Sequence, residues 1–301
     1  MNNATLNRYL SHLRHELNYS ERTVEAYGRD LRQFVAFLAG QAGGKVELET
    51  VDSTDVRAWL AHRSEAGDCA RTLRRKVQSV RGLYRFMMSR GEVADNPAAD
   101  LELARLPKRL PTFVRAADMA SLLDADIDEG DQEAVRDRLI VMMLYETGMR
   151  RAELIGLQDA WVDTAKGELR VHGKRDKDRV IPFGTELASW ITRYRTLRDG
   201  AGAAGATFFT RADGQPLYAS LVYRVVHEQL RQVGVVDKAS PHVLRHSFAT
   251  AMLGGGARLD SVKELLGHES VATTQVYTHV TLSDIKNNYK HAHPRALKKG
   301  G

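Results

Sequence analysis

A proline-rich stretch between Asn96 and Pro111 constrains the fold of this chain more than any other feature. Three of the seven prolines in the 301 residues lie there, at Pro97, Pro107 and Pro111. Proline removes a backbone hydrogen-bond donor and biases the preceding residue away from the helix, so regular structure should be interrupted. The length suffices for two domains with separate cores. We therefore expect an N-terminal domain at 1–105, a linker at 106–111 and a C-terminal domain at 112–301.

The composition indicates a folded chain that does not insert into a membrane. Hydrophobic residues make up 43% of the sequence, and no apolar run reaches the roughly 18 residues that a membrane span needs. The first residues, Met1 to Thr5, lack the basic start and apolar stretch of a signal peptide. Cys69 is the only cysteine, which excludes an internal disulfide and a cysteine-rich zinc site. These features fit a reducing cytoplasm.

The first hundred residues have the apolar periodicity of helices. Ser20 is placed to cap a helix whose apolar side chains form one stripe, namely Val24, Tyr27, Leu31, Phe34, Val35 and Leu38. Ser53 or Thr54 is predicted to cap a second helix, whose inward residues are Val56, Trp59 and Leu60. A third helix is predicted to end near Gly91.

The third helix carries basic residues between positions 71 and 90 and no acidic residue. Its apolar residues alternate at spacings of four and three and form one face, made of Leu73, Val77, Val80, Tyr84 and Met87. The net charge of +6 is a weak sign of nucleic-acid binding, but a solvated helix surface normally mixes both signs. We therefore favour a helix that follows DNA phosphates over a merely solvated one. Its predicted contacts are Arg71, Arg74, Arg75, Lys76, Arg81 and Arg85.

The second domain is predicted to be mainly helical, with a small antiparallel sheet. An apolar helix at 135–147 ends at Gly148, where glycine lets the chain turn. Short β segments at 168–171 and 179–182 flank a polar turn at 174–177. The fold class expected for the whole chain is therefore mainly α.

Arg150 and Arg151 open the helix that follows Gly148. The free amide groups of a helix start favour an anion, and Glu153 is close enough along the helix to steady Arg150. A guanidinium group is always charged, and its planar fork matches phosphate oxygens. A surface arginine pair is the simpler interpretation of this segment alone.

His242 and Arg245 share one face of another helix start. The Ser-Pro pair at 240–241 is a strong N-terminal signal, and a spacing of three places both side chains near the positive helix end. A zinc site at His242 and His246 is disfavoured, because Val243 stands where the metalloprotease motif has glutamate. Further on stand His268 and Tyr277, which alone indicate nothing specific.

Taken in order, these residues resemble the tyrosine recombinase (phage integrase) family. The surrounding strings also match the family: TGMRRAEL at 147–154, HVLRHSFAT at 242–250, and LLGH at 265–268 with the later TT and YTH. Lys174 follows Gly173 at the family's lysine position. The resemblance covers the N-terminal helices too. The compact length and the ending HAHPRA at 291–296 resemble the Xer branch, which resolves chromosome dimers.

The resemblance implies a SAM-like N-terminal DNA-binding domain and a catalytic C-terminal domain. It implies that Arg150 and Arg245 hold the scissile phosphate, while His242 and His268 donate hydrogen bonds to it or manage the tyrosine proton. It further implies that Lys174 protonates the departing 5′ oxygen and that Tyr277 attacks to form a 3′-phosphotyrosine. That bond keeps the energy of the broken one, so no ATP, metal or cofactor is expected.

The implied partners are double-stranded DNA, further recombinase subunits and a translocase. Four protomers, either copies of this chain or pairs with a homologous recombinase, would hold two DNA sites, and a DNA translocase at the division septum is a further implied partner. Leu282, Ile285 and Tyr289 form one face of a helix after the nucleophile. We expect this helix to dock on a neighbouring protomer, with folding back on its own domain as the alternative.

Other functions remain open at this point. A mobile-element or phage integrase of the same family is one, although many of these carry an extra N-terminal domain. A type IB topoisomerase shares the arginines, lysine and tyrosine but needs no docking tail. A silent DNA-binding protein would not need all six candidate catalytic residues. Arg175 stands where the family usually has glycine after the lysine, which leaves the shape of the lysine turn open, and Arg151 stands where an aliphatic residue is common.

Overall fold

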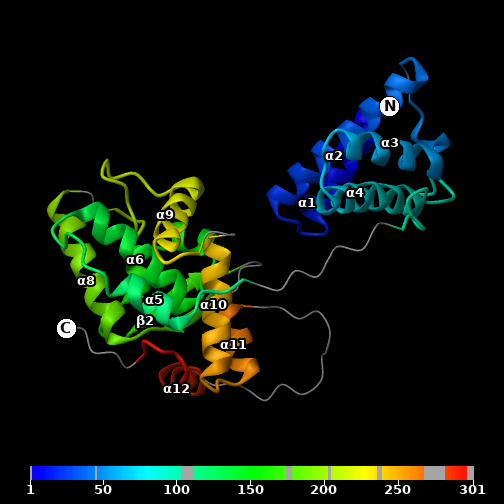
Figure 1. Cartoon of the computed structure of the whole chain (residues 1–301). Helices are drawn as coiled ribbons and strands as arrows, with labels where there is room; N and C mark the ends of the chain where they lie inside the picture. Colours follow the sequence, from blue (N-terminus) through cyan, green and yellow to red (C-terminus); the bar gives the residue numbers. More distant parts are fainter. Residues whose placement is uncertain are drawn as a thin grey trace. The chain divides into compact units, whose positions relative to one another are not determined.

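The structure is a computed structural model that describes residues 2–44, 46–102, 112–173, 178–202, 205–235, 239–267 and 282–296. The chain divides into two compact units, Met1–Arg109 and Leu110–Gly301. Figure 1 shows the helices and strands of the two units. Each unit has its own hydrophobic core. The predicted linker at 106–111 and the lysine turn at 174–177 lie outside the described residues. No helix in the described ranges is long and apolar enough to cross a membrane.

The N-terminal unit is helical, as its apolar stripes predict. Its described helices are α1 (Asn2–His15), α2 (Glu21–Ala42), α3 (Ser53–Glu65) and α4 (Ala70–Ser89), with a short 3-10 turn at Leu48–Thr50. The predicted stripe of α2 is buried at Leu31, Phe34 and Leu38, and the ring of Phe34 lies 4.9 Å from that of Trp59 on α3. Burial of these faces closes a core among α1, α2, α3 and α4.

The start of α3 differs from the prediction by one residue. The N-cap is Asp52, not Ser53 or Thr54, and its Oδ1 accepts hydrogen bonds from the backbone N–H groups of Thr54 and Asp55. The Asp55 carboxylate in turn accepts from the N–H of Asp52 at 3.1 Å. This reciprocal capping box satisfies the backbone N–H groups of Asp52, Thr54 and Asp55, and its negative charge is favourable at the positive end of the helix.

The C-terminal unit is mainly helical and contains a three-stranded antiparallel sheet. Its helices are α5 (Ala116–Leu123), α6 (Gln132–Thr147), α7 (Arg151–Ile155), α8 (Thr185–Gly200), α9 (Ala219–Gln232), α10 (Pro241–Gly254), α11 (Leu259–Leu266) and α12 (Leu282–Ala292). A 3-10 turn at Asp159–Trp161 leads into β1 (Val162–Asp163), β2 (Glu168–His172) and β3 (Asp178–Pro182). The strand order is β1-β2-β3, with Leu169 opposite Ile181. The mainly α fold class with a small antiparallel sheet is confirmed.

Helix α6 is the central element of this unit (Figure 1). It packs against α8, α9 and α10, and its residues from Leu139 to Thr147 are all buried. A helix that is apolar on every side must lie inside the protein. It ends at Gly148, whose φ of 62° lies in the left-handed region where glycine is favoured. The chain therefore turns sharply out of the core just before Arg150.

Helix α12 packs on its own unit, against α10, α11 and β3. Ile285 and Tyr289, which the sequence places on one face, are 7% and 1% exposed and belong to the core cluster. Beyond the helix, the Arg295 guanidinium bonds to Asp124 at 2.9 Å and to Glu186. In the single chain the apolar face of α12 covers the chain's own core, which is the folded-back arrangement, and docking on a neighbouring protomer stays a prediction.

Candidate active site

Arg150 is held between two segments that are far apart in the sequence. It is the N-cap residue of α7, and its backbone N–H donates to Glu153 Oε2 at 2.7 Å. Its guanidinium donates from Nη1 to Glu153 Oε1 at 2.8 Å and from Nη2 to the carbonyl oxygen of Gly267 at 2.8 Å. The side chain stays 34% exposed. Arg150 is thus oriented by fixed partners while one part of it remains open to a ligand.

Glu153 is a buried carboxylate with two arginine partners, as the spacing predicts for Arg150. Arg179 on β3 makes a paired contact with it, Nη1 to Oε1 at 2.9 Å and Nη2 to Oε2 at 2.8 Å. Burial on its own raises the pKa of Glu153. The hydrogen bonds and charge of Arg179, together with the bonds from Arg150, outweigh that effect and hold the pKa below its ordinary value. The carboxylate is therefore ionised at neutral pH.

Arg245 lies deeper than Arg150, with only 7% of the residue exposed. It projects from the second turn of α10 and donates to the carbonyl oxygens of Gly148 at 2.7 Å and Leu266 at 2.5 Å. Burial, followed by the nearby positive charge of Arg150, lowers the pKa of Arg245 to about 10. The group still carries its charge at neutral pH, and no carboxylate among the described residues bonds to it directly.

These bonds bring Arg150 and Arg245 to the same place, the C-terminal end of α11. The carbonyl groups at a helix end have no partner within the helix and carry partial negative charge. Here they accept hydrogen bonds from guanidinium groups, and both arginines keep further N–H donors for a ligand. Two fixed positive groups side by side suit the two non-bridging oxygens of a phosphodiester, and preorganised charge of this kind stabilises a phosphoryl-transfer transition state.

Of the four remaining predicted catalytic residues, the structure describes only His242. His242 is exposed at the start of α10, one turn before Arg245. Lys174, His268 and Tyr277 lie outside the described residues. His268 follows Gly267 directly in the sequence, and Gly267 ends α11 with a left-handed φ of 61°. Among the described residues, no group of histidine, cysteine, aspartate and glutamate side chains could hold a metal ion.

The predicted DNA-contacting helix is α4, and its apolar face is buried at Val77, Val80, Tyr84 and Met87. Its basic residues do not all lie on the surface, which corrects our expectation. Lys76 is 2% exposed, and its ammonium bonds to Asp30 at 3.3 Å and to Gln33. A buried ammonium with a carboxylate partner stabilises the fold and cannot reach a phosphate without leaving that partner.

Two further arginines of α4 also have partners inside the protein. Arg75 bonds to Asp30 and the carbonyl oxygen of Ala26, and Arg81 donates to the carbonyl oxygens of Ala98 and Leu101. Arg74 is half-buried and makes interactions of its own. Arg71 and Arg85 are exposed. Of the six predicted DNA contacts, these last two have the most freely accessible side chains.

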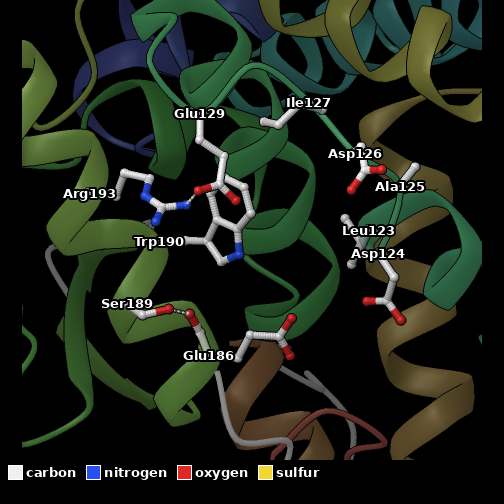
Figure 2. Close-up of a pocket in the computed structure, with 10 residues that line it drawn as sticks. All are labelled: Leu123, Asp124, Ala125, Asp126, Ile127, Glu129, Glu186, Ser189, Trp190 and Arg193. Carbon is white, nitrogen blue, oxygen red and sulfur yellow. Dashed lines mark hydrogen bonds and ion pairs between the residues drawn. The ribbon is translucent and has the colours of Figure 1, made fainter. Parts of the chain in front are cut away.

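A pocket elsewhere on the C-terminal unit contains none of the candidate catalytic residues (Figure 2). It lies between the segment after α5 and helix α8 and has an acidic lining that includes Asp124, Asp126 and Glu186. Asp124 and Glu186 are the partners of Arg295 in the C-terminal segment. This part of the surface therefore anchors the chain's own tail, which adds to the burial of α12.

Sequence reasoning missed one residue of the site, Arg179. In the sequence it is one of two arginines in the two β segments, and nothing distinguishes it from Arg170 on the neighbouring strand. The structure shows Arg170 exposed and Arg179 with 9% of its side chain exposed. Only the strand register and the position of α11 separate the two.

Comparison with known protein families and proteins gives two family matches. The phage integrase family matches residues 112–283, and the N-terminal SAM-like domain of phage integrases matches residues 6–91. The tyrosine recombinase XerC of Chlorobaculum tepidum is 36% identical, over 97% of this chain and 94% of that protein. XerC of Mycobacterium sp. (strain JLS) is 39% identical over 97% and 99%, and that of Pseudomonas aeruginosa PAO1 is 34% identical over 99% and 97%.

Solved structures share the fold at lower sequence identity. The Tn1549 transposon integrase in complex with transposon right end DNA has a TM-score of 0.70 at 19% identity, covering 95% of this chain and 98% of that one. The XerH site-specific recombinase bound to palindromic difH substrate has a TM-score of 0.69 at 20% identity, covering 91% and 80%.

Proposed function

The chain belongs to the phage integrase family, and from this premise we propose that it resolves chromosome dimers as a site-specific DNA recombinase of the tyrosine type. The family match confirms the resemblance first seen in the motifs, and the relatives named XerC confirm its Xer-branch, XerC-like character. The observation that carries the proposal is the convergence of Arg150 and Arg245 at the end of α11, with donors left over for a phosphate.

We assign the steps of the reaction as follows. Arg150 and Arg245 hold the non-bridging oxygens and neutralise charge that builds up in the transition state. Glu153 keeps Arg150 in place. His242, exposed at the positive end of α10, donates a hydrogen bond to the same phosphate or helps to manage the tyrosine proton.

The remaining roles rest on the sequence motifs. Tyr277 attacks the phosphorus, the bond to the 5′ oxygen breaks, and a 3′-phosphotyrosine forms. Lys174 gives a proton to the departing 5′ oxygen, and His268 assists at the phosphate. A phenol has a reference pKa of about 10, so nearby cations are needed to favour its deprotonated form. A 5′ hydroxyl from a second strand reverses the steps and reseals the DNA.

The expected partners follow from strand exchange between two duplexes. We propose a tetramer on two DNA sites, composed of this chain alone or with a paired homologous recombinase, and activation by a DNA translocase at the division septum. Acting on the chromosome would place the protein in the cytoplasm. The relatives of 34% and 39% identity that match nearly the whole of this chain are named XerC, which favours chromosome resolution over mobile-element integration.

Covalent capture on genomic DNA tests the proposal. The protein is incubated with fragmented DNA of its own genome, denatured in detergent, and the DNA that remains attached is sequenced. We expect one chromosomal site, with the protein on a 3′ phosphate. Recovery of many unrelated sites would favour a topoisomerase, recovery of the ends of a mobile element would favour an integrase, and no attached DNA would contradict the proposal.

A further inference from the structure

Three arginines from three different elements bind three consecutive carbonyl groups at the end of α11. Arg179 of β3 donates from Nε to Leu265 at 2.7 Å, Arg245 of α10 donates to Leu266 at 2.5 Å, and Arg150 at the start of α7 donates to Gly267 at 2.8 Å. Two of the three belong to the proposed catalytic set. The third, Arg179, has no role in the reaction steps assigned above.

Arg179 is the residue that joins this carbonyl row to Glu153. Both terminal nitrogens of its guanidinium bond to the two carboxylate oxygens of Glu153, while its Nε bonds to α11. The contact with α11 is tight: a Cβ atom added to Gly267 would lie 3.1 Å from Nη1 of Arg179. One side chain therefore fixes both the carboxylate that orients Arg150 and the helix end that leads to His268.

Arg179 also lies at the start of β3, five residues after Lys174 in the sequence. The strand that carries Arg179 thus follows, in the sequence, the predicted turn with the proposed general acid Lys174. Its bonds to Glu153 and Leu265 connect that strand to the arginine pair. No other described side chain bonds to both Glu153 and the end of α11 except Arg150 itself.

We propose that Arg179 is a positioning residue for phosphodiester cleavage, which sets Arg150 through Glu153 and sets the end of α11 through Leu265. The proposal rests on the proposed recombinase function. Arg179 keeps Arg150, a proposed partner of the phosphate, in the orientation that the transition state needs. Arg179 itself touches no reacting atom.

Lysine cannot replace arginine in this role. A guanidinium group offers five N–H donors in a planar fork, which here serve two carboxylate oxygens and one carbonyl oxygen. An ammonium group keeps the charge but concentrates its donors at one point, so it cannot hold both partners in this geometry. Arg179→Lys therefore separates the charge of the residue from its geometry.

The test compares Arg179→Lys with Arg170→Lys in the full-length protein. Arg170 lies on the adjacent strand and is exposed, so it controls for loss of an arginine from the sheet. The probe is a nicked oligonucleotide duplex that carries the site recovered by covalent capture. Single-turnover cleavage, DNA affinity and the folded fraction from circular dichroism are measured for each variant. Misplacement of a reacting group by about 1 Å can slow a reaction on the order of 100-fold.

We expect Arg179→Lys to slow cleavage per folded molecule by about 10- to 100-fold, with DNA affinity within about twofold of the wild type because the phosphate contacts themselves remain. Arg170→Lys should cleave at the wild-type rate. Cleavage by folded Arg179→Lys at the wild-type rate would overturn the proposal. A decrease in cleavage that only matches the decrease in folded fraction would also overturn the proposal, since such a decrease is a structural effect. If the wild type itself forms no adduct, the recombinase function fails instead.

A double-mutant cycle with Glu153→Gln adds a readout that a packing defect would not give. If Arg179 acts through Glu153, the combined rate loss of the double variant should be smaller than the product of the two single losses, because both changes remove the same Arg179–Glu153 linkage. Multiplied rate losses would overturn this linkage. If Arg179→Lys does not fold, the cycle uses Arg179→Gln with Glu153→Gln, which removes both buried charges together. Wild-type cleavage by that folded double variant would likewise contradict the proposal.

Discussion

Arg150 and Arg245 donate hydrogen bonds to two neighbouring carbonyl oxygens, those of Gly267 and Leu266. The two arginines are 95 positions apart in the sequence (245 − 150) and come from different helix starts. Their shared anchor is the negative end of α11, which satisfies part of each guanidinium without cancelling its charge. A phosphate that binds both groups is therefore held against a fixed frame.

The first prediction concerns Glu153 and pH. The pKa of Glu153 in the folded protein lies below its ordinary value. Its ion pairs therefore contribute their full stabilisation at pH values above the unfolded-state pKa of about 4.3. The stabilisation is lost as the pH falls from there through the lower folded-state pKa. We expect Glu153→Gln to lower the free energy of unfolding by about 3 kcal/mol near neutral pH, and by less in acid. Hydrogen exchange of the α6 amides measures the opening of this unit alone.

Glu129→Gln is the matched control, because Glu129 pairs with Arg193 on the surface, where both side chains are about half exposed. An exposed pair contributes on the order of 0–1 kcal/mol. A Glu153→Gln effect that does not change with pH would show that the carboxylate charge is not what stabilises the site.

The second prediction concerns Gly148, where α6 turns out of the core. A Cβ atom there would lie 2.4 Å from Cδ1 of Phe248, and the φ of 62° is unfavourable for any other residue. We expect Gly148→Ala to destabilise the C-terminal unit by about 2–5 kcal/mol, as the sum of backbone strain and overpacking. Gly254→Ala should change stability by less than about 1 kcal/mol, because no atom lies within 4 Å of the added methyl group. Equal stability of the two variants in urea unfolding would refute this account of the turn.

The third prediction concerns α12. Tyr289 is 1% exposed in the core of its own unit, whereas the next residue, Lys290, is exposed. We expect Tyr289→Ala to destabilise the isolated protein by about 3–5 kcal/mol and Lys290→Ala to change it by no more than about 0.5 kcal/mol. Thermal unfolding of the monomer measures both. If neither variant changes the stability, the helix does not pack in cis in solution and docking on a neighbour regains support.

The fourth prediction separates the basic residues of α4. Lys76→Met should lower the stability of the N-terminal unit by about 1–3 kcal/mol, because Asp30 loses its buried ammonium partner and keeps only the partly exposed Arg75. Its DNA affinity per folded molecule should not change. Arg71→Ala and Arg85→Ala should each change the free energy of unfolding by no more than about 0.5 kcal/mol. Each should also weaken DNA binding and reduce the number of counterions released on binding by about one. Titrations at several salt concentrations measure this, and an altered salt dependence in Lys76→Met would count against the buried assignment.

The sequence predicts the elements of the fold well where a local rule decides them. The stripe at Leu31, Phe34 and Leu38 and the glycine stop at Gly148 both depend on neighbours within a turn or two, so the pattern alone suffices. The cap of α3 was misassigned by one residue, because Asp52, Ser53 and Thr54 are all good caps and only the geometry of the chain entering the helix chooses among them.

The site was predictable only in part, for a physical reason. The motifs contain Arg150, Glu153 and Arg245, but the bonds that orient them reach carbonyl groups of α11, which no side-chain pattern reveals. Arg179 was missed for the same reason. The burial of Lys76 was missed because its partner Asp30 lies on another helix, so a one-sided charge pattern on α4 looked like an open surface.

The most direct test of the central claim is covalent capture with Tyr277→Phe. Phenylalanine keeps the ring and removes only the nucleophilic oxygen, so binding should survive while the reaction stops. The wild type and the variant are incubated with the nicked site duplex, boiled in detergent and separated by electrophoresis. The account predicts a protein–DNA adduct for the wild type and none for Tyr277→Phe, with equal DNA affinity before denaturation. An adduct of undiminished yield with Tyr277→Phe would contradict it.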